Sequence, residues 1–220
     1  MHPYDHARSS VKLHGGRWQD YFAYHHHFDS SKSALCHFTH RALKHHTEGV
    51  AAAREIFGDH IANSDGVSVS TETLGRQHLA EDCRILPSAS DWVEGFEPPS
   101  WLPCLTPTIE DLVADDVRRF GGDAEIYHPL HDWFYQTKTW VDGPAWFLFR
   151  HHSFGVFQAE ERFGPVLGAV SGSAVPTRVV AERHVQRVLG RTPPASDFLR
   201  RIKGERWMLQ ATSPKKLGLD

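Results

Sequence analysis

With 220 residues, of which 40% are hydrophobic and 11% aromatic, the chain has enough apolar side chains for a buried core, which excludes global disorder. Its net charge of -3 with neutral histidines excludes the basic excess typical of nucleic-acid-binding proteins. The opening MHPYDHARSS has no apolar signal-peptide region, and no run approaches the length of a membrane span. We therefore expect a soluble, cytoplasmic protein with neither a nucleic-acid nor a membrane partner.

The first half of the chain is predicted to be mainly helical. Gly15 and Gly58 end two of its helices, and the alternation of Val67 and Val69 with serines predicts one arm of a hairpin. In chain order, the predicted elements are helices over 4–13, 18–34 and 36–57, a polar loop HIANSDG, a strand near 67–69, a helix over 72–84, and a last short helix capped by Ser88 or Ser90.

The second half repeats this order after the proline-rich linker 98–110. Its predicted elements are helices over 123–140, 142–163, 177–189 and 196–203, with a strand near 174–176. The sequence thus predicts a mainly α fold of two tandem homologous helical domains, each with a short β-hairpin or strand, packed about a pseudo-two-fold axis. The expected domains are 1–102, 103–210 and a flexible tail over 211–220.

A shift of 106 residues aligns residues 5–102, the first copy, with residues 111–208, the second copy, without a gap. Of the 98 aligned pairs 25 are identical, whereas random pairing at ordinary composition gives about 6. A period this long indicates duplicated domains, because solenoid repeats are much shorter.

Seventeen histidines are the outlier of the composition. The second copy has five, and four of these align with histidines of the first copy, which has eleven. The coinciding pairs are His25/His131, His45/His151, His46/His152 and His78/His184. Shared retention within one chain makes these positions the candidates for a common site.

The predicted helices carry these histidines with carboxylates nearby. His25 and Asp29 are four residues apart, as are His78 and Asp82, so each pair shares a helix face. His45 is expected to share a face of the long central helix with Glu48, while His46 points about 100° away. Imidazoles and carboxylates from facing helices are typical of metal sites in bundles.

The two copies differ in their acids. Asp29, Glu48 and Asp82 become Tyr135, Phe154 and Val188, and Asn63-Ser64-Asp65 becomes Ala169-Val170-Ser171. If carboxylates are required, the first copy is functional and the second is degenerate. If the histidines suffice, both copies bind a ligand.

Four motifs of the first copy are similar to a domain-of-unknown-function family of bacteria and phages whose members are about one domain long. They are HxxFDSSK (His25–Lys32), HRALKHHTEG (His40–Gly49), NSDG (Asn63–Gly66) and GRQHLAED (Gly75–Asp82). The second copy departs from these motifs at the acids, at His40 and Arg41, and at NSDG. The resemblance implies no activity.

A second, weaker resemblance is to the metal-dependent phosphohydrolases of the HD superfamily. Their pattern is a His, a His-Asp pair and a distant Asp, which His25, His45-His46 and Asp82 follow in order, although His46 replaces the Asp. This resemblance serves only to rank reaction classes, and it places phosphate-ester hydrolysis first.

These observations predict a metal-binding, histidine-rich protein that hydrolyses a phosphate ester, with zinc, manganese or iron as cofactor. Its partner would be a small phosphorylated ligand or a protein, and Lys32 and Arg41 would hold the phosphate. The candidate ligands are His25, His45, His46 and His78, with second-copy equivalents His131, His151, His152 and His184, and the candidate catalytic residues are Asp29, Lys32 and Asp82. The alternatives are a non-enzymatic binding module and a scaffold whose histidines bond helices together.

Overall fold

The chain forms two compact units in a computed structural model that describes residues 1–168 and 174–219. Unit 1 comprises Met1–Gly95 and Ile202–Asp220, and unit 2 comprises Phe96–Arg201. The second-copy triplet Ala169-Val170-Ser171, compared above with Asn63-Ser64-Asp65, lies outside the described residues.

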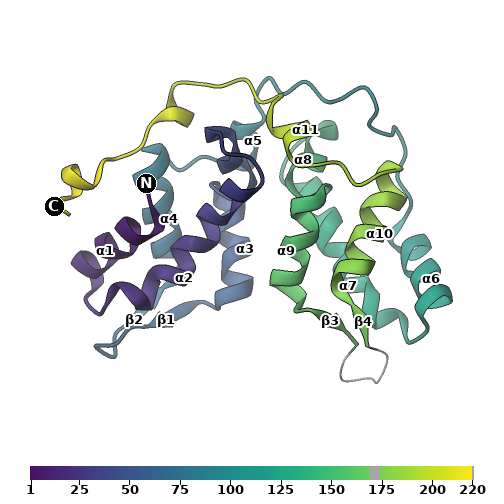
Figure 1. The fold of residues 1–220 in the computed structure, drawn as a ribbon, viewed down its shortest axis with the longest axis horizontal. Helices are drawn as coiled ribbons and strands as arrows, with labels where there is room; N and C mark the ends of the chain where they lie inside the picture. Colours follow the sequence, from purple (N-terminus) through teal and green to yellow (C-terminus); the bar gives the residue numbers. More distant parts are fainter. Residues whose placement is uncertain (169–173, 220) are drawn as a thin grey trace. The chain divides into compact units, whose positions relative to one another are not determined.

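Unit 1 is built mainly from four helices around one core (Figure 1). A two-stranded antiparallel hairpin, in which Ile61 pairs with Val69, connects the third helix to the fourth. Its elements are α1 (Pro3–His14), α2 (Trp18–Asp29), η1 (Ser30–Ser33), η2 (Phe38–Leu43), α3 (Thr47–Phe57), β1 (His60–Ala62), β2 (Ser68–Ser70), α4 (Thr71–Cys83), α5 (Ala89–Trp92), η5 (Trp207–Leu209) and η6 (Pro214–Leu217).

Unit 2 repeats the order of the main helices around its own short hairpin, in which Leu167 pairs with Val175, and has the additional short helix α8 before α9. Its elements are α6 (Ile109–Phe120), α7 (Ala124–Gln136), η3 (Thr137–Thr139), η4 (Gly143–Trp146), α8 (Phe147–Arg150), α9 (Ser153–Phe163), β3 (Val166–Leu167), β4 (Val175–Pro176), α10 (Thr177–Leu189) and α11 (Ser196–Leu199). The mainly α class and the tandem organisation are confirmed, and the pseudo-two-fold packing remains a prediction. Within the described ranges, no helix is long and apolar enough to span a membrane.

The two cores use equivalent positions. Nine residues form the core of unit 1, and each of the nine positions 106 residues later is also buried and apolar. The pairs are Ala7/Val113, Tyr21/Tyr127, Tyr24/Leu130, Phe28/Phe134, Val50/Val156, Ala53/Ala159, Val69/Val175, Leu74/Val180 and Leu79/Val185. The sequence alignment with a shift of 106 residues therefore also superimposes the structurally equivalent core positions of the two units.

The expected continuous helix over 36–57 is wrong. The chain forms the 3-10 helix η2, leaves helical geometry at Lys44–His46, and starts α3 at Thr47. The reason lies at His46, whose extended backbone (φ -149°) and side chain cap α3 by accepting a hydrogen bond from the Gly49 amide at 3.0 Å. The second copy breaks in the same way at His152, so the helix expected over 142–163 is also wrong.

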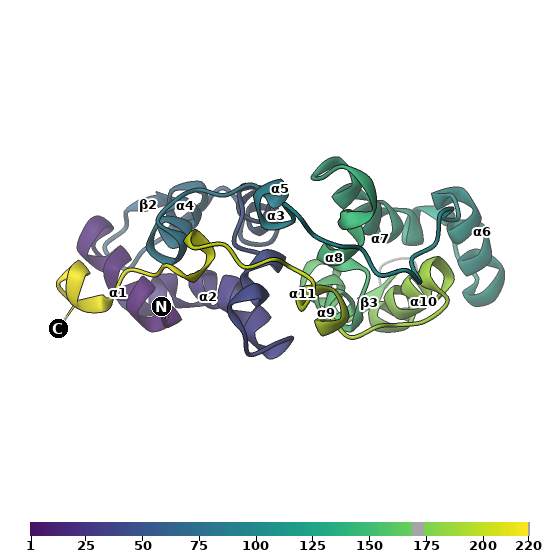
Figure 2. The ribbon, with the colours of Figure 1, turned by 90° about the horizontal axis from the view of Figure 1, so that it is seen from above.

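The end of the chain belongs to unit 1 and runs along α4 towards α1 (Figure 2). The Thr212 amide donates to the Glu81 carbonyl oxygen at 2.7 Å, and Lys12 donates to the Leu217 carbonyl oxygen at 2.7 Å. Leu219 is buried. Residues 211–219, expected as a flexible tail, thus contact the body of unit 1.

Candidate metal centre and its histidine chain

Three of the four candidate histidines of the first copy meet in the centre of unit 1. His25 comes from α2, His78 from α4, and His45 from the break before α3, and none has exposed surface. His25 Nδ1 lies 3.1 Å from His78 Nδ1, and His78 Nε2 lies 3.1 Å from His45 Nε2. We call these three residues the histidine chain of unit 1, in which His78 presents one ring nitrogen to each neighbour.

His46 does not join the histidine chain. Its Nδ1 is the N-cap acceptor of α3, so this nitrogen is committed to the Gly49 amide. Because His45 and His46 lie at the break rather than inside a helix, the expectation that His45 and Glu48 share a helix face is wrong. Glu48 contacts His46 Nδ1 at 3.2 Å and accepts from the Ala89 amide at 2.9 Å.

Two buried carboxylates lie beside the histidine chain. Asp82 Oδ2 is 3.3 Å from His45 Nε2 and 4.0 Å from His78 Nε2. Asp29, His45, His78 and Asp82 each offer one ligand atom within 4.8 Å of the others. The sequence pairs His78–Asp82 and His25–Asp29 thus contribute to one place in the fold, as the i, i+4 spacing suggested.

The two cations expected to hold a phosphate instead neutralise these carboxylates. Lys32 Nζ lies 2.6 Å from Asp29 Oδ1. Arg41 Nη2 lies 3.2 Å from Asp82 Oδ2, and its Nη1 donates to the Asp82 and Met208 carbonyl oxygens at 3.1 and 3.3 Å. The amino group of Met1 also bonds Asp82 Oδ1. Each carboxylate therefore has a positive partner, and Arg41 contacts the same oxygen of Asp82 that faces His45 and His78.

His6 is a member of this buried cluster that the sequence reasoning missed. Its Nδ1 lies 2.5 Å from Glu81 Oε2 and its Nε2 lies 3.4 Å from Asp82 Oδ1. Burial by itself lowers the pKa of His6, but the hydrogen bonds to Asp82 and Glu81 outweigh burial and raise it above its ordinary value. His6 aligns with Leu112, so comparing the copies for shared histidines could not find it.

Although His6, His25 and His78 also have nitrogens near one another, their rings are poorly placed for one ion. The rings of His6 and His78 stack at 3.9 Å between centroids with an angle of 29° between planes. Imidazole binds a metal along its ring plane, and stacked rings direct their lone pairs side by side rather than to one point. The His45 and His78 planes differ by 57°, so their lone pairs can converge.

Burial keeps the histidine chain neutral. Burial is the main reason why the pKa values of His25 and His78 lie well below the ordinary value for histidine. Burial also lowers the pKa of His45, although the contact with Asp82 acts in the opposite direction. Burial would raise the pKa of Asp82, but hydrogen bonds from His45 and His6 outweigh it and hold this pKa far below its usual range. Neutral imidazoles and ionised carboxylates are the protonation states that a metal ion requires.

Unit 2 contains the same histidine chain with a different end. His131 Nδ1 lies 2.8 Å from His184 Nδ1, and His184 Nε2 lies 3.1 Å from His151 Nε2. The far nitrogen of His131 lies 2.9 Å from Asp116 Oδ2. The equivalent nitrogen of His25 contacts the Ser10 hydroxyl at 2.8 Å, and Ser10 is the first-copy partner of Asp116 in the alignment.

The second copy has therefore gained one acid as well as lost others. Val188 replaces Asp82 at one end of the chain, and Asp116 replaces Ser10 at the other, where Arg183 donates to it at 3.1 Å. Tyr135 replaces Asp29, and Lys138, the partner of Lys32, lies over the Tyr135 ring at 3.7 Å. In the part of the chain that the structure describes, close groups of metal-ligating side chains occur in unit 1 alone.

The fold and the site define a protein made of two helical domains, each organised around a buried chain of three histidines. The chain belongs to the family described as "Domain of unknown function (DUF6915)", whose family model matches residues 1–102 and again residues 112–208. No curated protein and no solved structure matches it.

Proposed function

We propose that unit 1 binds one divalent transition-metal ion through Asp29, His45, His78 and Asp82. The observation that supports this most directly is the mutual spacing of His45 Nε2, His78 Nε2 and Asp82 Oδ2, which are 3.1, 3.3 and 4.0 Å apart. Ligands about 2.0–2.1 Å from a tetrahedral ion are about 3.3 Å from one another. The three atoms therefore need only small shifts to surround an ion, with Asp29 as the fourth ligand.

The ligand types narrow the choice of metal. Two imidazole nitrogens and two carboxylate oxygens suit zinc, iron or manganese, whereas a thiolate-preferring ion such as copper(I) would find no soft ligand here. Cys83 follows Asp82 in the sequence but is not among the close ligand atoms. Cobalt(II) suits the same ligands and reports its coordination through visible absorption, which makes it the best probe.

The contacts favour an ion held for structure over one that turns over a phosphate ester. All four ligands are at most 3% exposed, so a substrate cannot reach the ion in this conformation. Lys32 and Arg41, which would hold the phosphate, are paired with Asp29 and Asp82. Hydrolase activity consequently remains a prediction that requires the site to open.

The test is metal content after loading. Metal-free full-length protein is equilibrated with zinc or cobalt, desalted, and measured by inductively coupled plasma mass spectrometry. We expect one ion per chain, with a visible spectrum for cobalt typical of four-coordinate geometry. Asp82→Asn removes the charge at constant side-chain size, and His78→Ala removes a ligand. Each should weaken binding at least about tenfold, the usual effect of losing even an indirect partner of a metal ligand.

The second copy provides the matched control. His184→Ala changes the same position as His78→Ala but in a chain of histidines without the two carboxylates, so it should leave the metal content at one ion. Wild-type protein that retains no zinc, cobalt, manganese or iron would contradict the proposal. So would a loss of metal in His184→Ala equal to that in His78→Ala.

For unit 2, the hydrogen bonding favours the scaffold alternative. If His151 donates to His184, His184 to His131, and His131 to Asp116, each neutral imidazole supplies one proton to the next acceptor. This order links α10, α7 and α6 to the break before α9 without a ligand. His184→Ala should accordingly lower the free energy of unfolding while leaving metal binding intact.

A further inference from the structure

The boundaries of the sequence copies and of the compact units do not coincide. The first copy extends to residue 102, but unit 1 ends its first segment at Gly95, and Phe96 already belongs to unit 2. The second copy extends to residue 208, but from Ile202 onwards the chain belongs to unit 1. We name residues 202–219 the C-terminal strap and residues 96–107 the linker strap.

Equivalent tryptophans make equivalent contacts on the opposite copy. Trp207, at the end of the second copy, packs edge-on against Trp92 of the first copy at 4.8 Å between centroids. Trp101, its partner 106 residues earlier, packs edge-on against Phe198 of the second copy at 5.5 Å. Phe198 is the aligned partner of Trp92, so the two contacts are equivalent. In each of them the end of one copy packs on the body of the other copy.

Each strap also reaches the region of the histidine chain. In unit 1, the Met208 carbonyl oxygen accepts from Arg41, which pairs with Asp82, and Trp92 donates to the His45 carbonyl oxygen at 2.7 Å. In unit 2, Tyr135 donates to the Pro107 carbonyl oxygen at 2.7 Å, and its ring stacks on His151. Each strap thus reaches a residue beside the histidine chain of the unit in which it lies, although the contacting residues are not aligned partners.

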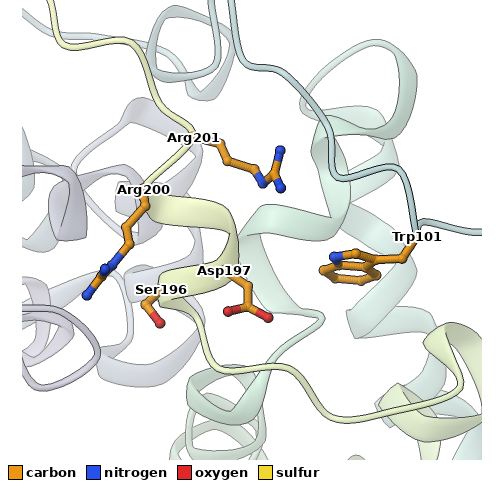
Figure 3. A pocket seen from close by; sticks show the side chains of 5 residues that line it. All are labelled: Trp101, Ser196, Asp197, Arg200 and Arg201. Atoms are coloured by element: carbon orange, nitrogen blue, oxygen red, sulfur yellow. The ribbon is translucent and has the colours of Figure 1, made fainter.

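The residues around Trp101 also belong to the opposite copy. Figure 3 shows Trp101, from the first copy, lining a pocket whose other labelled residues are Ser196, Asp197, Arg200 and Arg201, all from the second copy. Arg191 of the second copy lies over the indole at 4.2 Å and pairs with Asp197 at 2.8 Å. The first copy therefore supplies an aromatic anchor to a surface otherwise built by the second.

We propose that the two copies exchange their ends, so that each domain is completed by the strap that belongs, in sequence, to the other. The surface formed by η2, α4 and α5 of the first copy is then a docking site for the end of a second copy of the same domain. The tandem duplication supplies this second copy within one chain. The occupant is the C-terminal strap, with Trp207 and the buried Met208 as its anchors.

The proposed interchange of ends can be tested without any metal, by measuring amide hydrogen–deuterium exchange in the full chain. Trp207→Ala should raise amide exchange about tenfold in α4 and α5, because an aromatic anchor is lost there, and leave α10 and α11 unchanged. Trp101→Ala, its aligned counterpart, should do the reverse. Trp207→Phe keeps an aromatic anchor and should restore most of the protection.

The thiol of Cys83, which is buried at the end of α4, gives an independent readout. Its alkylation, measured by mass spectrometry against the exposed Cys36 and Cys104, should accelerate in Trp207→Ala and not in Trp101→Ala. Loosening of unit 1 by Trp101→Ala would show that each copy is completed by its own end and would overturn the proposal. Equal effects of both variants on both units, or no effect of either, would overturn it as well.

Discussion

At the scale of single residues, the break between η2 and α3 requires Gly49, because the backbone of Lys44 leaves no room for a side chain there. A Cβ on Gly49 would lie 2.1 Å from the Lys44 carbonyl oxygen, and one on Gly155 would lie 1.8 Å from that of Arg150. Neither glycine has a left-handed φ, so the requirement is space rather than backbone freedom. Because the clashing atoms belong to the backbone, no side-chain rotation relieves the overlap.

Gly49→Ala should therefore destabilise the protein by about 2–3 kcal/mol through overpacking at the break. Gly190→Ala is the comparison, since its Cβ would meet open space and the cost comes only from its left-handed helical backbone (φ 76°, ψ -8°), about 1–2 kcal/mol. Urea unfolding of both variants measures the difference. A Gly49→Ala cost no larger than that of Gly190→Ala would contradict this explanation.

At the scale of elements, the adjacent histidines His45 and His46 have different roles because helix α3 begins directly after them. His45 lies in the middle of the break and faces His78, whereas His46 is the N-cap residue of α3. His152 caps α9 in the same way, with its Nδ1 2.9 Å from the Gly155 amide. Both copies thus use this histidine in the same structural role, as the N-cap of the following helix.

His46→Ala should cost about 1 kcal/mol, the usual loss of an N-cap acceptor, and His46→Asn should recover part of it because Asn is a strong N-cap residue. Thermal unfolding measures both effects, and His152→Ala is the matched change in unit 2. Neither His46 variant should alter metal content, while His45→Ala should remove the ion. Loss of the ion in His46→Asn would mean that His46 is a ligand after all.

At the scale of the whole molecule, many buried neutral histidines make stability depend on pH. In unit 2, burial is the main cause that lowers the pKa of His151 and His184 well below the ordinary value and that of His152 to about 4. Lys138 and Arg150 lower the pKa of His151 further. Below about pH 6.5 these residues bind protons when unfolded but not when folded, so acid favours the unfolded state.

The metal-free protein should therefore lose stability as the pH falls below about 6.5, by about 1.4 kcal/mol per pH unit for each such histidine. His152→Asn removes one of these groups, so its stability should fall about 1 kcal/mol less between pH 7.5 and 5.5. Urea unfolding at both pH values measures the difference. Equal losses in the variant and the wild type would contradict the assignment of His152 as a buried neutral group.

The sequence alone predicted the duplication, the register of the cores, most helix ends and three members of the histidine chain. Helical periodicity could not reveal the break at Lys44–His46, because the capping by His46 depends on a backbone bend that leaves the apolar pattern intact. His6 and Asp116 were missed because their aligned partners, Leu112 and Ser10, differ in chemistry. Polar residues on the core-facing side of the first helix of each copy were the signal that could have found them.

What the sequence determined by itself was the repeated pattern of apolar and histidine positions, since identical local preferences give each copy the same elements. Only the tertiary structure decided which nitrogens face one another, because the rings of His25, His45 and His78 come from segments up to 53 residues apart. It also decided where each domain ends. The straps carry few local signals, and their place is set by the aromatic partners Trp92 and Phe198 on which they pack.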